Sequence, residues 1–164
     1  TRTEEMEDYT TTEYTYATSK DTIDVELDGL KTWNNIDEIG VDVSGVGYYF
    51  TTFTLPDGFT AANGAYLDLG KLESSVKVTI NGVDASDVNV DRARVDVSDL
   101  LKDGENTLEI RLSTTLTNRV LSLGLQPAGA ADLFGMKFPL YVNGYFKYGL
   151  TDVNLIPYAQ VVVE

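Results

Sequence analysis

Short segments in which apolar and polar residues alternate dominate the chain. Apolar residues occupy every second position at 23–27, 76–80 and 108–112, namely Ile23, Val25, Leu27, Val76, Val78, Ile80, Leu108, Ile110 and Leu112. A strand with one buried face shows this period of two, because successive side chains point to opposite faces of a sheet. The pattern predicts three strands, and we expect the six apolar residues of the second and third segments to face inward.

Turn signals separate these segments from further strand-like ones. Residues 48–55 are aromatic and β-branched and end at Pro56-Asp57-Gly58, and Asn81-Gly82 is typical of a two-residue hairpin turn. The only helix-like stretches are short, at 32–39 and at 97–101, where Ser98 is placed to cap one turn. Many short strands without crossover helices predict an all-β fold, an antiparallel two-sheet β-sandwich of jelly-roll type.

Composition narrows the chemistry open to this fold. The 164 residues suit one globular domain, and 12 Lys and Arg against 26 Asp and Glu give a formal charge of -14. Such a charge repels polyanions, so we expect neither nucleic acid nor an anionic membrane as a partner. The absence of Cys and His excludes disulfides, thiolate nucleophiles, imidazole bases and ordinary zinc sites.

Half of the net negative charge lies in residues 1–28, which hold nine acidic side chains against Arg2 and Lys20. The Thr-rich run at 10–12 and the alternation of Tyr14 and Tyr16 predict an edge strand of the same domain, where the acidic side chains would oppose pairing with other molecules. The alternative is a tail that binds a partner. Residues 29–164 are assigned to the β-sandwich domain, and the start at Thr1 leads us to expect a module of a longer protein.

Two loop regions offer candidate chemistry. Residues 124–149 combine five glycines with six aromatic residues, which either cap the open end of the sandwich or form a docking face for a neighbouring domain. A second loop carries oxygen ligands suited to calcium, at Asp84, Asp87, Asn89 and Asp91. Because no Asp-x-Asp-x-Asp-Gly motif is present, we expect a solvated acidic loop there, and neither a metal nor another cofactor.

A series of short motifs spans roughly residues 30–158, namely Trp33, Ser44–Pro56, Leu67–Gly70, Val76–Gly82, Asp96–Leu101, Gly104–Ile110, Thr114–Arg119 and Tyr148–Tyr158. Their order resembles that in the sugar-binding, galactose-binding-like β-sandwich domains of family 2 and family 106 glycoside hydrolases. Each motif alone is weak, and the combination is specific. Many of these residues also have a purely structural explanation, since Asn-Gly and Asp-Leu-Gly form turns.

The resemblance implies a noncatalytic carbohydrate-binding or accessory domain of a larger glycoside hydrolase. In the resembled families the catalytic carboxylates lie on a separate barrel domain, so we expect this chain not to be an enzyme. The implied partners are a glycan or polysaccharide and the catalytic domain of the parent protein, outside the cell or at the surface of a bacterium. The alternative is a structural or adhesive sandwich module of a cell-surface protein with no sugar ligand.

A sugar site needs a flat aromatic ring beside side chains that donate and accept hydrogen bonds. Trp33, Asn118, Arg119 and Tyr145 have this chemistry, and we expect them at one end of the sandwich. The resemblance places Asn118-Arg119 at the family's domain junction. For Trp33 the competing interpretation is a plug of the core, and for Arg119 it is a surface ion pair.

Overall fold

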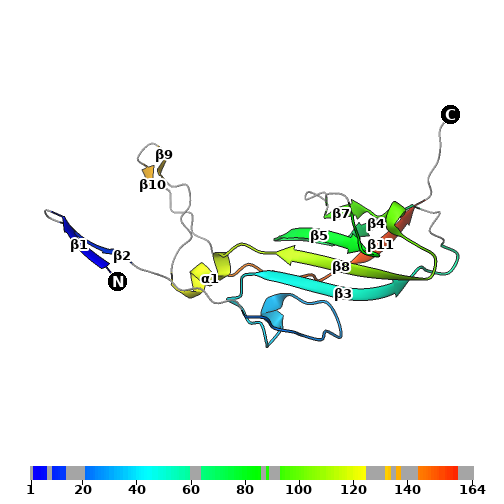
Figure 1. Cartoon of the computed structure of the whole chain (residues 1–164), viewed down its shortest axis with the longest axis horizontal. Helices are drawn as coiled ribbons and strands as arrows, with labels where there is room; N and C mark the ends of the chain where they lie inside the picture. Colours follow the sequence, from blue (N-terminus) through cyan, green and yellow to red (C-terminus); the bar gives the residue numbers. More distant parts are fainter. Residues whose placement is uncertain are drawn as a thin grey trace.

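Two antiparallel sheets form the body of the protein. The computed structural model describes residues 2–6, 9–13, 21–59, 64–85, 88, 93–124, 132–133, 136–137 and 144–158. One sheet has the strand order β3-β8-β5-β6 and the other the order β11-β4-β7. The four-stranded sheet runs along the long axis of the molecule (Figure 1). The strands are β3 (Val46–Thr54), β4 (Gly64–Asp68), β5 (Ser75–Ile80), β6 (Val83–Asp84), β7 (Arg94–Asp96), β8 (Glu105–Ser113) and β11 (Asn154–Tyr158).

The core lies between the two sheets, as the alternation predicts. Of the six residues expected to face inward, Val78, Ile80, Leu108, Ile110 and Leu112 are buried, and Val76 is half-buried against the same cluster. The three-stranded sheet contributes Ala65, Leu67 and Val95 to this cluster. The prediction of an all-β, antiparallel two-sheet β-sandwich is confirmed.

The β5–β6 hairpin turns at Asn81-Gly82, as the sequence predicts. Asn81 and Gly82 both have positive φ, 51° and 80°, which is the backbone that a tight two-residue turn requires. The pairs Thr79–Asp84 and Ile80–Val83 then close the hairpin.

The alternating segment at 23–27 is not a strand, contrary to the prediction. Residues 21–27 form no strand pairing with any described residue, although Val25 and Leu27 are half-buried against the core. Alternation of apolar and polar residues indicates that one side of a segment is buried, and a segment can be buried in this way without hydrogen bonds to a neighbouring strand.

The short helical segments also differ in detail from the expectation. The stretch at 32–39 contains the 3₁₀ turn η1 (Trp33–Asn35), and 97–101 contains η2 (Ser98–Leu100). The predicted capping role of Ser98 is wrong, because its hydroxyl instead accepts the backbone N–H of Ala65 at 3.0 Å. The helix α1 (Thr117–Ser122) was not predicted.

Two hairpins complete the described elements. In the acidic N-terminal segment β1 (Arg2–Met6) pairs with β2 (Tyr9–Glu13), and β9 (Asp132–Leu133) pairs with β10 (Met136–Lys137). Both hairpins are antiparallel and lie apart from the two sheets (Figure 1). The assignment of residues 1–28 and 29–164 to one domain stays a prediction.

Asn106 on β8 is fully buried, and its amide holds the turn before that strand. Its Oδ1 accepts the Asn81 Nδ2–H and the Lys102 backbone N–H, both at 2.9 Å. Its Nδ2 donates to the carbonyls of Lys102 and Gly104 at 2.9 and 3.0 Å. Every hydrogen-bonding atom of the side chain is therefore satisfied, as burial of a polar group requires.

Asn106→Ala is expected to lower the free energy of unfolding by about 3 kcal/mol, because several buried groups lose their partner together. Urea denaturation followed by circular dichroism measures the loss. Asn154→Ala is the matched control, since among the described residues that exposed amide bonds only the Asp152 side chain. Equal midpoints for the two variants would contradict the role given to Asn106.

Asp68 links the end of β4 to β7 through its ionised carboxyl. The pKa of Asp68 lies below its usual range because the Gly70 N–H, at 2.9 Å, and then the Arg94 guanidinium bond the charged form. Gly70 has φ +66°, a backbone conformation that glycine adopts without strain at the turn after β4. A depressed pKa in the folded state means that ionised Asp68 stabilises the fold above its unfolded pKa of about 3.9.

Stability is therefore expected to fall as the pH drops from about 5 through the folded pKa of Asp68. Asp68→Asn should flatten this slope while lowering stability at neutral pH. Arg94→Gln should give an intermediate slope, since the Gly70 hydrogen bond remains. Urea midpoints measured from pH 7 to 3 would test this, and parallel curves for wild type and Asp68→Asn would refute it.

Candidate functional site at the end of the sandwich near α1

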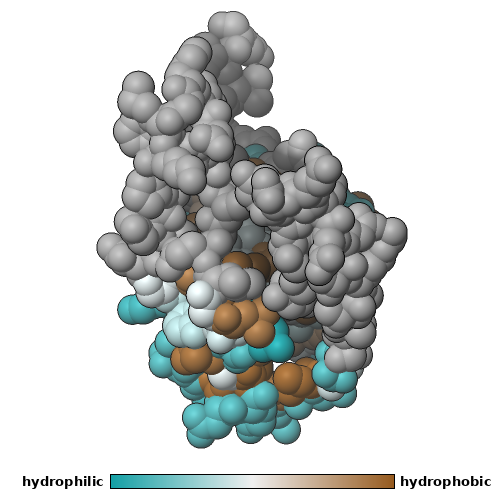
Figure 2. Space-filling view, turned by 90° about the vertical axis from the view of Figure 1, so that its left-hand side faces the viewer, coloured by the Kyte–Doolittle hydropathy of each residue, from teal (hydrophilic) through white to brown (hydrophobic). Residues whose placement is uncertain are grey.

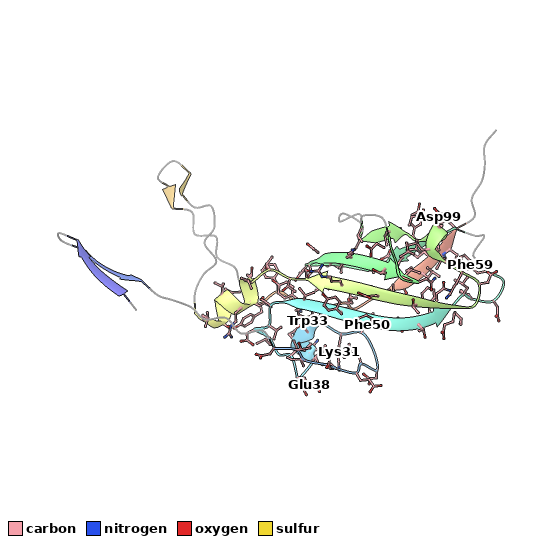
Figure 3. The ribbon with its side chains drawn as sticks, in the orientation of Figure 1. Lys31, Trp33, Glu38, Phe50, Phe59 and Asp99 are labelled. Carbon is pink, nitrogen blue, oxygen red and sulfur yellow. The ribbon has the colours of Figure 1, made fainter. Side chains whose placement is uncertain are left out.

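Trp33 is part of the core and is fixed from three sides. Only 6% of its surface is exposed, and its Nε1–H donates to the Tyr49 hydroxyl at 2.7 Å. Its backbone N–H donates to the carbonyl of Tyr148 at 2.8 Å, and the two rings meet edge to face with centroids 6.2 Å apart. Figure 3 shows Trp33 in the η1 segment beside β3. This burial matches the core-plug interpretation of Trp33.

Two glycines make room for the indole ring. A Cβ on Gly47 would lie 2.6 Å from Cζ2 of Trp33, and a Cβ on Gly149 would lie 3.0 Å from Cδ1. Gly149 also has φ +114°, a backbone conformation that other residues rarely adopt. Two glycines of the motifs at 44–56 and 148–158 are thus explained by the packing of Trp33.

Asn118 joins three segments at the same end. The side chain on α1 is 2% exposed, and its Nδ2 donates to the carbonyls of Val41 and Phe146 at 3.3 and 2.9 Å. Its Oδ1 accepts the backbone N–H of Phe146 at 2.8 Å. Both donors and the acceptor of the amide are engaged by the backbone, so Asn118 positions the loops around α1.

Arg119 and Tyr145 lie at the surface of this end. The Arg119 guanidinium donates to the Asp42 carboxylate at 2.9 Å, with the two side chains 59% and 41% exposed. An ion pair this open contributes little to stability. Tyr145 is 43% exposed and is next to Phe146, whose ring stacks on Tyr148 with centroids 5.9 Å apart.

The structure thus brings the four predicted site residues to one end of the sandwich. Asn118 and Arg119 lie on α1, and Tyr145 precedes Phe146, whose backbone N–H is bonded to Asn118. Trp33 connects to them through the stacked rings of Tyr148 and Phe146. Two of the four are buried and two are exposed. Their role in sugar binding stays a prediction.

Sequence reasoning missed an exposed apolar surface around α1. We call it the α1 patch; it consists of Val41, Leu116, Leu123, Tyr145 and Phe146, all at least 37% exposed. Figure 2, which views the molecule toward this end, shows hydrophobic side chains between hydrophilic ones. Leu116 and Leu123 flank α1 and are 69% and 55% exposed, a signal that becomes readable only once the helix is known.

The loop with candidate oxygen ligands for calcium, which we expect to be a solvated acidic loop, is only partly described. Asp87, Asn89 and Asp91 lie outside the described residues, and Asp84 forms an ion pair with Lys77 at 2.8 Å. Across the part of the chain that the structure describes, no group of three or more acidic side chains could hold a metal ion. In that same part, no helix is long and apolar enough to cross a membrane.

Trp33→Ala is expected to lower the free energy of unfolding by about 3–5 kcal/mol, as other large-to-small core changes do. Circular dichroism during urea denaturation measures this. Phe50→Ala is the control, because that ring is 71% exposed and its loss should change stability by less than about 1 kcal/mol. A Trp33→Ala protein as stable as wild type would show that the indole ring does not support the core.

Comparisons with known proteins agree with this geometry. Residues 46–122 match the family model described as "Glycosyl hydrolase 2 galactose-binding domain-like". Over 99 residues the chain is 30% identical to a protein of Formosa agariphila named "Putative beta-glucuronidase", covering 59% of this chain and 8% of that protein. The rhamnosidase structure from Novosphingobium sp. PP1Y superposes with a TM-score of 0.63 at 27% identity, covering 82% of this chain and 13% of that chain.

The chain therefore spans only a small part of the length of these relatives. The matched residues run from β3 through α1, and so include the whole four-stranded sheet and Asn118-Arg119. The family resemblance that the sequence motifs predict is confirmed: residues 46–122 match the galactose-binding-like domain model of glycosyl hydrolase family 2.

Proposed function

We propose that the chain is a noncatalytic accessory module of a larger glycoside hydrolase and docks through the α1 patch onto another domain of the parent protein. The observation that carries this is an exposed apolar patch on a rigid end of the sandwich. Exposed apolar clusters rimmed by polar groups are typical of interaction surfaces. The patch here is rimmed by Arg119 and Asp42.

The way the patch is built supports docking. Asn118 ties Val41, Phe146 and α1 together through three hydrogen bonds, so the apolar side chains are held before any partner arrives. A preorganised surface loses less conformational entropy on association. Domain interfaces within one chain bury about 600–1,500 Å² and mix apolar and polar groups, which fits a patch of this character.

The names of the relatives support the kind of parent protein. One is named a beta-glucuronidase and the other a rhamnosidase, and this chain corresponds to about a tenth of each. In the proposal, glycoside hydrolysis takes place on the remainder of the parent chain, and this module supports that remainder. The catalytic domain is then the partner, and a glycoside is the substrate of the assembly.

Leu116→Asp with Leu123→Asp is expected to weaken docking at least tenfold, because both side chains would carry charge into an apolar interface. The measurement is the dissociation constant between the 164-residue chain and the separately produced remainder of its parent protein. Lys102→Asp, exposed near the opposite end of β8, changes charge outside the patch and is the control.

Both proteins should retain the circular dichroism spectrum of wild type, because the substituted side chains are exposed. Undiminished association of the double variant would refute docking through the α1 patch. Hydrolysis of aryl glycosides by the isolated chain, abolished by substitution of one of its carboxylates, would refute the noncatalytic role.

A further inference from the structure

An apolar groove lies between residues 21–30 and residues 43–54, outside the α1 patch. Its volume is about 1740 Å³, and core residues such as Leu108, Ile110 and Leu155 form its floor. Pockets for single small molecules usually measure about 300–1,000 Å³. The groove follows the whole of β3, whose length is about 30 Å at about 3.3 Å per residue. These dimensions suit an extended chain.

The strand β3 presents its free edge to the groove. It is an outer strand of its sheet, and consecutive residues of it line the groove, those that point to the core as well as those that point away. Thr52 is opposite Thr107 on β8, whose carbonyl accepts the Asn81 N–H at 3.0 Å on the far side. Thr107 therefore turns its backbone groups away from β3, and in such a pair Thr52 turns its own N–H and C=O into the groove. Tyr48 and Phe50, at the same parity along β3, do likewise.

The other side of the groove also has a backbone without strand pairing. No backbone hydrogen bond joins residues 21–30 to another described residue, although Val25 and Leu27 are half-buried against the core. Consecutive residues of this segment line the groove, which runs between it and β3 (Figure 1). An extended chain placed in the groove could therefore form ladder hydrogen bonds with β3 and with segment 21–30.

Charge on the two sides of the groove is of one sign. Segment 21–30 contains no basic residue and four acidic ones, namely Asp21, Asp24, Glu26 and Asp28. The acidic residues at 24, 26 and 28 are exposed and alternate with half-buried Val25 and Leu27, so they point to the solvent side. Residues 46–54 of β3 include neither a charged residue nor a proline, the usual protections of a free edge. The groove therefore favours a strand that is apolar inside and basic outside.

We propose that a strand from the remainder of the parent protein fills this groove and extends the four-stranded sheet at β3. Its apolar side chains, at alternate positions, cover Leu108 and Ile110, and the lysine or arginine side chains between them lie beside Asp24 and Glu26. Backbone pairing supplies affinity in this mode of recognition, and the alternate side chains supply specificity. The source of the strand rests on the proposed function, since the relatives are many times longer than the part that this chain matches.

Fluorescence anisotropy with a synthetic peptide tests the chemistry of the groove. The probe is a fluorescein-labelled peptide as long as β3 in which lysine and valine alternate, and it should bind the 164-residue chain with a dissociation constant on the order of micromolar. A peptide of the same composition with all its lysines at one end controls for attraction to the net charge of -14. This second peptide should bind at least tenfold more weakly, because it cannot direct apolar and basic side chains to opposite faces.

Two pairs of variants locate the binding. Thr52→Pro removes an N–H that faces the groove and takes no hydrogen bond from β8, so it should weaken binding of the alternating peptide at least tenfold, while Thr52→Ala should not. Asp24→Asn with Glu26→Gln should weaken binding severalfold. Asp37→Asn with Glu38→Gln is the matched control, since these exposed residues make the same charge change outside the groove. Circular dichroism should show that each variant keeps the fold.

The proposal is overturned if the alternating peptide does not bind, as when residues 21–27 themselves close onto β3. It is also overturned if both peptides bind equally, or if Thr52→Pro and the Asp24 and Glu26 double variant bind like wild type. A dimer in sedimentation equilibrium that Thr52→Pro dissociates would overturn it in favour of a second copy at the β3 edge.

The separately produced remainder of the parent protein should displace the alternating peptide from the wild-type chain. A remainder that docks and leaves the peptide bound overturns the groove proposal and not the α1 patch. The Leu116→Asp and Leu123→Asp protein should bind the peptide like wild type, because the α1 patch lies outside the groove. Undiminished docking of that variant, with peptide binding as expected, overturns the α1 patch and not the groove.

Discussion

The burial of Trp33 is the interaction on which the end of the sandwich near α1 depends. Its ring leaves no room for a side chain at Gly47 on β3 or at Gly149, and its Nε1–H donates to the Tyr49 hydroxyl. The Tyr49 hydroxyl also accepts the backbone N–H of Leu150 at 3.3 Å. One aromatic side chain therefore joins η1, β3 and the segment leading to β11, and burial of so large a ring is a major stabilising term.

Two buried asparagine side chains also hold loop segments in place. Asn106 and Asn118 are the buried polar side chains among the described residues, and each bonds backbone groups on both sides of a turn or loop. An amide has donors and an acceptor in one rigid plane, so it can replace the strand partner that a loop lacks. The loops at both ends are thereby fixed, and the surfaces that they carry become defined in shape.

Much of the fold could be predicted because the period of two in β5 and β8 directly reports which side chains are buried, and Asn81-Gly82 specifies a turn by its own backbone preference. Residues 21–27 and α1 are the elements that these sequence signals do not predict correctly. The first has a buried side without strand pairing, and the second is a six-residue helix with no side-chain cap, too short for a periodic signal.

The candidate site was harder to predict, because its character depends on contacts between distant segments. Trp33 stands in a polar sequence context, between Lys31 and Asn35, yet it is buried, since the residues that cover it come from β3 and 148–150. Asn118 has the chemistry of a sugar contact, yet its amide is engaged by Val41 and Phe146, which are far from it in sequence. The sequence correctly predicts that Tyr48 and Phe50 belong to a strand, and only the structure shows that their rings are exposed.

Trp33 is the only tryptophan of the chain, and its placement gives the protein a built-in optical probe. Indole emission depends on the polarity around the ring, and here the ring is buried from solvent and its N–H is bonded to the Tyr49 hydroxyl. A red shift of emission would therefore report the opening of a single junction, where η1, β3 and the segment before β11 meet. Time-resolved measurements on the unlabelled chain can follow this junction separately from the unfolding of the sheets.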